Sequence, residues 1–136
     1  MSFLKNTFSK YFIIIFVSVL SLIQLRSCLL YDEIKKNGTN IVVKFTLKDD
    51  LPKRTYFYFT YFVNGKKITT ANSSIHYSIL NSEAETEIID NLKINHFYLA
   101  RYVPKDPDKI IVNPLKEVTN TVAILKAGFT KEDIKK

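Results

Sequence analysis

The sequence predicts a mainly β protein: an N-terminal transmembrane or signal-anchor helix, then a small antiparallel β-barrel or sandwich, then a short C-terminal helix. Three observations support this prediction. Residues 11–25 carry no charge, residues 55–63 hold six aromatic side chains before an Asn-Gly pair, and two later strand-like segments flank a proline-containing turn. A chain of 136 residues has room for one domain and a short appendage. We divide it into a signal anchor or signal peptide (1–30), a linker (31–40), a β-domain (41–113) and a C-terminal extension (114–136).

The N-terminal segment has the charge order of a membrane-targeting sequence. Lys5 and Lys10 precede the fifteen uncharged residues 11–25, which as a helix span roughly 22 Å, less than the hydrocarbon core of about 30 Å. Extension to Tyr31 gives twenty-one residues, and Arg26 near the far end can place its charge at the interface. We expect this segment to enter the lipid bilayer.

Three fates of this segment are open. We favour a retained anchor over a simple cleaved signal, although the basic and apolar regions also suit the latter. The third fate is a lipoprotein signal at "LRSC" (25–28), in which Cys28 is acylated, but Arg26 occupies a position where a small or apolar residue is usual. Basic residues lie on both sides of the segment, so they do not fix its orientation. The order of charge and then apolar run favours a β-domain outside the cytoplasm.

Charge and cysteine content argue against several classes of protein. Residues 1–30 supply +3 of the net charge of +7, and acids and bases are interleaved in the rest of the chain, whereas nucleic-acid binders concentrate basic charge. Cys28 is the only cysteine, which excludes an internal disulfide and a four-cysteine metal site. His76 and His96 have no Glu or Cys at ligand spacing. We expect no cofactor, no metal and no nucleic-acid partner.

The β-domain is expected to begin with a strand at residues 41–47, rich in β-branched residues and broken by "KDDLPKR". On a regular strand, one face carries Ile41, Val43, Phe45 and Leu47.

The aromatic segment is expected to form a β-hairpin with the residues that follow it. Asn64-Gly65 suits a two-residue type I′ turn, in which both central residues need φ > 0. That turn pairs Val63 with Lys66, Tyr61 with Ile68 and Thr60 with Thr69. The face with the apolar partner is the expected core face, and it holds Phe57, Phe59, Tyr61 and Val63. The opposite face holds Tyr56, Tyr58, Thr60 and Phe62.

The second half of the domain carries weaker signals. A strand is considered at 74–80, although its polarity argues against one, and Glu83, Glu85 and Glu87 would share a face if their segment were a strand. Clear strands are expected at 96–103 and 109–113. Asn113-Pro114 resembles a helix start, and Gly128 suits its end.

Two stretches give the chain a family resemblance. "RTYFYFTYFVNGKKITT" and "LKINHFYLARYVPKDPDKIIV" resemble segments of a group of small bacterial membrane proteins of unknown function. The shared marks are an aromatic strand ending in Asn-Gly-Lys and a Tyr-x-Pro-x-Asp-Pro turn, here Tyr102 to Pro107. A Gly-Asp or Gly-Glu pair usual in that group is replaced by Asn95-His96. The resemblance implies a leading transmembrane segment and a compact β-domain, and it brings no activity.

No catalytic constellation emerges from the spacing of residues, so we do not expect an enzyme. A stacking platform for nucleic acid or sugar needs basic residues among its rings, and none lies between Tyr56 and Val63. We expect a non-catalytic binding or structural module at the cell envelope, with an unidentified envelope protein as partner. The alternatives are a surface lipoprotein acylated at Cys28 and an envelope enzyme with an unrecognised site. The candidate binding surface is Tyr56, Tyr58 and Phe62.

Overall fold

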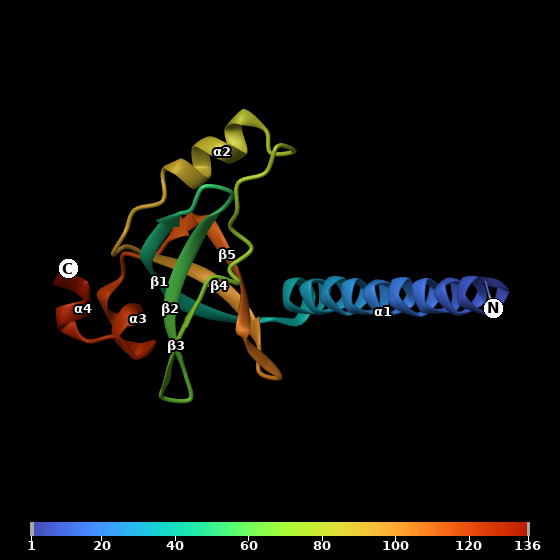
Figure 1. Ribbon diagram of the computed structural model, residues 1–136. Coiled ribbons are helices and arrows are strands. Elements are labelled where there is room, and N and C mark those ends of the chain that lie inside the picture. The colour runs from blue at the N-terminus through green and yellow to red at the C-terminus, as the bar shows by residue number, and fades with distance from the viewer. Residues whose placement is uncertain (1, 136) are drawn as a thin grey trace. The chain divides into compact units, whose positions relative to one another are not determined.

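The computed structural model describes residues 2–135, with side chains described from Lys5 to Lys135 (Figure 1). The chain divides into two compact units, residues 1–33 and 34–136. The elements, in chain order, are α1 (Ser2–Asn37), β1 (Thr39–Asp50), β2 (Thr55–Val63), β3 (Lys66–Thr70), α2 (Glu83–Asp90), β4 (Phe97–Val103), β5 (Asp106–Glu117), α3 (Thr121–Lys126) and α4 (Lys131–Lys135).

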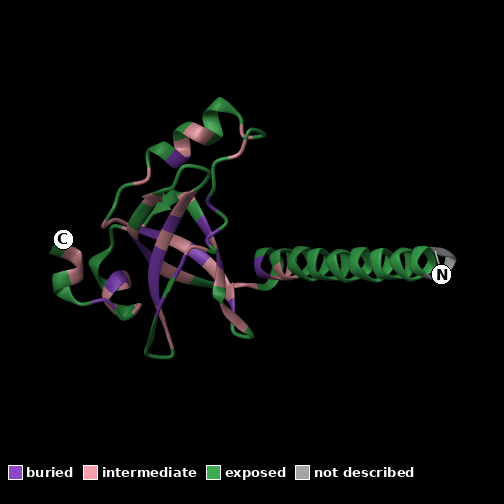
Figure 2. Ribbon diagram, in the orientation of Figure 1, coloured by how far each residue is buried: buried purple, intermediate pink, exposed green. Residues whose placement is uncertain are grey.

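Helix α1 is long and apolar enough to cross a membrane, as is true of anchors and of signal sequences, and no other described helix is. Its side chains are exposed along nearly the whole length (Figure 2). Helix α1 continues into the residues taken as a linker, 31–40, and ends at Asn37. Lys35 and Lys36 in its last turn suit the helix dipole. Gly38 ends it where a Cβ would lie 2.2 Å from the carbonyl oxygen of Ile34.

The domain is a five-stranded antiparallel sheet in the order β3-β2-β1-β4-β5, which confirms the predicted layout of an apolar helix, a small β-domain and short C-terminal helices. The sheet does not close into a barrel. Its two edge strands, β3 and β5, do not pair with each other in a ladder. Only the chain just after β3 reaches across: the carbonyls of Asn72 and Ser73 accept from the amides of Ile110 and Val112 at 2.9 and 3.1 Å.

The aromatic hairpin has the predicted turn and register. Asn64 and Gly65 adopt φ of 51° and 77°, and Val63 pairs with Lys66, Tyr61 with Ile68 and Thr60 with Thr69. Phe57, Phe59 and Tyr61 are buried in the main core, with 1%, 0% and 0% of their surface exposed. Phe45 of β1 stacks on Phe59, with ring centroids 5.1 Å apart.

Strand β1 contains a bulge that the alternating pattern did not predict. Phe45 pairs with Phe59, but Leu47 pairs with Tyr58, so Thr46 is the extra residue. Its Oγ1 donates to the Tyr58 carbonyl at 3.1 Å. The bulge turns Leu47 to the outer face, 52% exposed, and the expectation that it shares the core face of Phe45 is wrong.

Between β3 and β4 the chain forms a helix where strands were considered. Residues 74–80 form no strand. Glu83, Glu85 and Glu87, which would share a face only on a strand, lie on α2, because Ser82 and Glu85 form a capping box that starts a helix. Ile89 anchors this helix to the main core.

The C-terminal helix begins later than predicted. Strand β5 continues through Pro114 to Glu117, because this edge strand tolerates a proline in the irregular pairing between Asn113 and Glu117. Asn120 then caps α3 through its side chain. Gly128 follows the end of α3 with φ of 109°, in the role predicted for it.

Helices α3 and α4 pack on the outer face of the sheet. Ile124 and Phe129 are buried there with Phe97, and Phe62 packs against them. The Phe129 ring lies edge-on to Phe62 and Phe97, with centroids 5.2 and 4.9 Å away. Lys44 is only 7% exposed, and its Nζ donates to the Asp133 carbonyl at 3.0 Å. The domain therefore has a second, smaller core outside the sheet.

We predict that Phe57→Ala or Phe59→Ala lowers the free energy of unfolding of residues 31–136 by about 3–5 kcal/mol, because each removes a fully buried ring. Tyr58→Ala, half-buried on the outer face, should lower it clearly less. Chemical denaturation measures all three. Equal losses for Phe59→Ala and Tyr58→Ala would contradict the assignment of faces.

We predict that Gly128→Ala destabilises the packing of α3 and α4 more than Gly65→Ala destabilises the hairpin. Both glycines have positive φ, but a Cβ at Gly128 would lie 2.9 Å from Cγ of Phe62, whereas one at Gly65 meets nothing. The control therefore isolates the collision from the backbone strain, which is about 1–2 kcal/mol. Hydrogen exchange of α3 amides and the denaturation midpoint report the difference, and equal effects would refute it.

Candidate functional site

The outer face of β1 and β2 carries a small aromatic and apolar surface beyond the reach of the C-terminal helices. Tyr56 and Tyr58 are half-buried there, with ring centroids 6.3 Å apart. Their neighbours across the ladder are Asp49 and the exposed Leu47. The Arg54 guanidinium lies 5.2 Å from the Tyr56 ring centroid. We call Leu47, Arg54, Tyr56 and Tyr58 the outer patch.

Phe62 does not belong to this surface. The sequence places it on the same face of β2 as Tyr56 and Tyr58, but α3 and α4 cover it, and its ring packs on Phe129. The structure therefore keeps two of the three residues of the candidate surface together and assigns the third to the small core.

The sequence indicates that Arg54 belongs to the patch, but it does not indicate this for Leu47. Arg54 lies two positions before Tyr56, so the period of a strand puts it on the same side. Leu47 reaches the patch only through the bulge at Thr46. The absence of charge between Tyr56 and Val63 argued against a ring-and-cation surface, yet Arg54 supplies a cation from the preceding loop.

A polar cluster lies at the end of the sheet next to α2. The Tyr77 hydroxyl donates to the carboxylate of Asp90, and the Lys48 ammonium lies 5.4 Å from the Tyr77 ring centroid. The hydrogen bond with Tyr77 raises the pKa of Lys48, and burial raises the pKa of Tyr77. Lys48 therefore stays charged and Tyr77 neutral near pH 7, so the cluster is an electrostatic tie between β1 and α2.

A groove beside α4 contains the only histidine–carboxylate pair among the described residues. His96 Nδ1 and Glu117 Oε1 are in hydrogen-bond contact, and both side chains are about 40% exposed (42% and 38%). The groove, of about 370 Å³, is also lined by Thr119 and by Ile134 and Lys135 of α4. The two partners are 21 positions apart, so no local spacing could have revealed them. A carboxylate that orients an imidazole is found in sites of general-base chemistry, and it also occurs in structural pairs.

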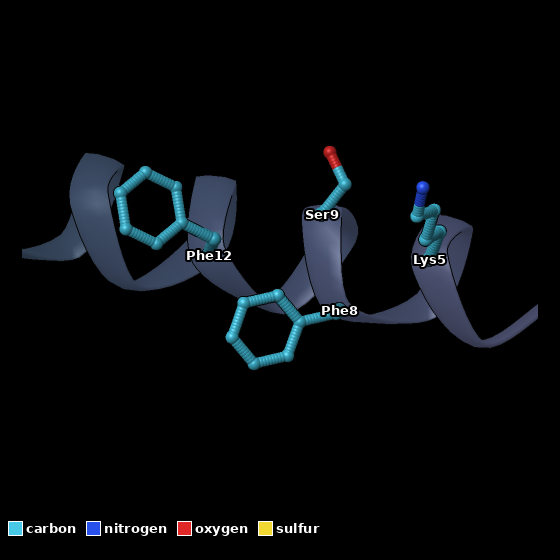
Figure 3. A pocket seen from close by; sticks show the side chains of 4 residues that line it. All are labelled: Lys5, Phe8, Ser9 and Phe12. Carbon is cyan, nitrogen blue, oxygen red and sulfur yellow. The ribbon is translucent and has the colours of Figure 1, made fainter.

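Features of α1 offer no enclosed site. Cys28, the residue that would be acylated in the lipoprotein alternative, is an exposed free cysteine on this helix. Lys5, Phe8, Ser9 and Phe12 flank a depression on its surface (Figure 3). All four come from successive turns of one helix, so the depression is an open notch between neighbouring side chains. Among the described residues no group of three or more His, Cys, Asp or Glu side chains is placed to hold a metal ion.

Comparison of the chain with protein-family models, characterised proteins and solved structures found no match.

We predict that acidification loosens α4. Thr130 N and Oγ1 donate to Oδ2 of Asp133 at 2.8 and 3.0 Å, and the bond from the Thr130 amide is the main cause that lowers the pKa of Asp133 below its ordinary value of 3.8. A lowered folded-state pKa stabilises the fold above pH 3.8, and this contribution is lost as the pH falls through the folded value.

The amide shift of Thr130, followed by NMR against pH, should titrate below 3.8, and Asp133→Asn should abolish that titration. A midpoint at or above 3.8 would contradict the cap.

Proposed function

We propose that this chain is a membrane-anchored, non-catalytic binding module whose β-domain lies outside the cytoplasm and recognises a protein partner at the cell envelope through the outer patch. The observation that carries the proposal is that exposed Leu47 and Arg54 lie on one face with the half-buried rings of Tyr56 and Tyr58. Aromatic residues and arginine are enriched in the centres of protein interfaces. Here they remain outside both cores.

The chemistry of the patch suits a polypeptide better than a nucleic acid. Each Tyr offers a rigid apolar ring with one polar tip, and Arg54 offers a fork of donors to a carboxylate or carbonyl. Asp49 pairs with Tyr56 in the ladder, and this carboxylate would repel a phosphate backbone. Mixed charge around a small apolar centre is typical of the rim of a protein interface.

The architecture is compatible with binding on this face. A five-stranded, partly open antiparallel sheet is also the form of the oligonucleotide- and oligosaccharide-binding folds, which use the face of strands 2 and 3 and the loop between strands 1 and 2. Tyr56 and Tyr58 lie on β2 and Arg54 lies in the β1–β2 loop. This analogy concerns architecture alone, because one fold hosts many functions.

The membrane address rests on α1 and on the resemblance to small bacterial membrane proteins. We predict that the full-length chain sediments with membranes and needs detergent for release, because α1 is long and apolar enough to cross a bilayer. Alkaline extraction followed by sedimentation tests it, with residues 31–136 as the soluble control. Recovery of the intact chain in the soluble fraction would contradict anchoring.

The mature N-terminus separates the anchor from its alternatives. A retained anchor begins at or near Met1, an acylated lipoprotein begins at Cys28 with a mass increase from its lipid, and a cleaved signal begins without lipid. Mass spectrometry of the membrane-extracted chain distinguishes the three. We propose the anchor because Arg26 is unfavourable in a lipoprotein signal.

We predict that a photoreactive phenylalanine analogue at Tyr56 forms a discrete adduct with one protein in intact cells. Arg54→Glu should weaken that adduct. The matched control is the same analogue at Leu115, which is 72% exposed on β5 outside the patch. The same adducts from both positions, or none from Tyr56, would exclude the outer patch as the interface.

The second candidate is an envelope enzyme, favoured only by the His96–Glu117 pair in its groove. If His96 acted as a general base, His96→Gln would remove an activity while leaving stability and the Tyr56 adduct intact. A structural pair would instead show a change in stability with no loss of activity.

A further inference from the structure

A groove on the outer face of the sheet is independent of the outer patch and of the His96 groove. It has a volume of about 410 Å³ and runs beside α3. Its apolar lining includes Val42 of β1, Phe62 of β2, Leu99 of β4 and Ala123 of α3. A volume of several hundred Å³ with an apolar lining is typical of small-ligand sites.

The charged groups at this groove are basic. Of the nine described residues that line it, none is acidic, and Lys126 is its one charged member. Arg101 lies on β4 between two lining residues, Leu99 and Tyr102. Its Nη1 donates to the Lys35 carbonyl at 2.6 Å, while its buried Nε has no hydrogen-bond partner. The groove thus combines an apolar lining with a cation and has a second cation beside it.

Chain connectivity keeps one end of the groove close to the end of α1. The lining residue Asn40 follows Asn37 by three positions, a reach of about 10 Å at most. Helix α1 has 36 residues and is therefore about 54 Å long, well beyond a hydrocarbon core of about 30 Å. If residues 11–30 span the hydrocarbon core, the next seven residues of α1, 31–37, lie in the headgroup layer.

We propose that this groove binds an anionic phospholipid of the membrane in which α1 is anchored. The apolar part of the lipid covers Val42, Phe62 and Leu99, and its phosphate pairs with Lys126, with Arg101 close by. Asp32 and Glu33 offset Lys35 and Lys36 at the end of α1, so the selectivity for an anion comes from Lys126 and Arg101. The inference rests on the anchoring proposed above.

The test uses the full-length chain in nanodiscs of equal parts phosphatidylcholine and phosphatidylglycerol. Native mass spectrometry after mild removal of the disc counts the lipid that stays bound. We expect phosphatidylglycerol to be retained over phosphatidylcholine, and Lys126→Glu to reduce its retention by at least about fivefold, the effect of losing one basic residue near an anionic surface. Lys131→Glu is the matched control, an exposed lysine on α4 that does not line the groove.

Hydrogen exchange in the same discs locates the lipid. Phosphatidylglycerol should protect amides of residues 40–42 and 123–127 in the native chain and leave them unprotected in Lys126→Glu. The comparison requires that the variant keeps the native thermal midpoint. If Lys126→Glu lowers that midpoint, Lys126→Gln is used in its place. Equal retention of both lipids, or equal loss in Lys126→Glu and Lys131→Glu, would overturn the lipid site alone. A full-length chain that does not enter nanodiscs at all would overturn the anchoring and this inference together.

Discussion

The fold depends on the inward burial of one row of aromatic rings in β2. Phe57, Phe59 and Tyr61 are almost fully inaccessible, and a domain of about 100 residues has few other side chains of this size to fill its interior. The two-residue turn at Asn64-Gly65 selects this row, because a slip of one residue would exchange it for the outward row. Tyr61 adds a polar tie, since its hydroxyl donates to the carbonyl of Pro107 in β5. Burial and the nearby Asp108 and Asp106 raise its pKa, so the hydroxyl stays a donor at physiological pH.

The role of each residue in the outward row of β2 depends on what covers its side chain. Phe62 is covered by α3 and α4, whereas Tyr56 and Tyr58 remain partly accessible beside Leu47 and Arg54. A single strand thus supplies the main core, one wall of the small core and the proposed recognition surface. The groove beside α3 is lined by Phe62 of the same strand together with Ala123 and Lys126 of that helix.

Local chemistry explains what the sequence could predict. The turn, the register of the hairpin, the buried face of β2 and the apolar helix all follow from residues close together in the chain. Leu47 was placed on the wrong face because an alternating pattern does not reveal a bulge. The C-terminal helix was predicted to start at Asn113-Pro114, but these residues continue β5, because an edge strand tolerates Pro114. The glutamates before Asp90 suit a helix only once Ser82 is seen as its cap. Phe62 and the His96–Glu117 pair depend on segments far apart in the sequence, which spacing alone does not bring together.

Ring-to-ring contacts measured by NMR in the β-domain test the burial of the inward row most directly. The structure predicts nuclear Overhauser effects between Phe45 and Phe59 and between Tyr61 and Ile68, together with contacts between Phe62 and Phe129. Contacts from Phe45 to Tyr58 or Phe62 in place of Phe59 would show that the outward row faces the core. The faces assigned here, and the patch and groove built on them, would then be wrong.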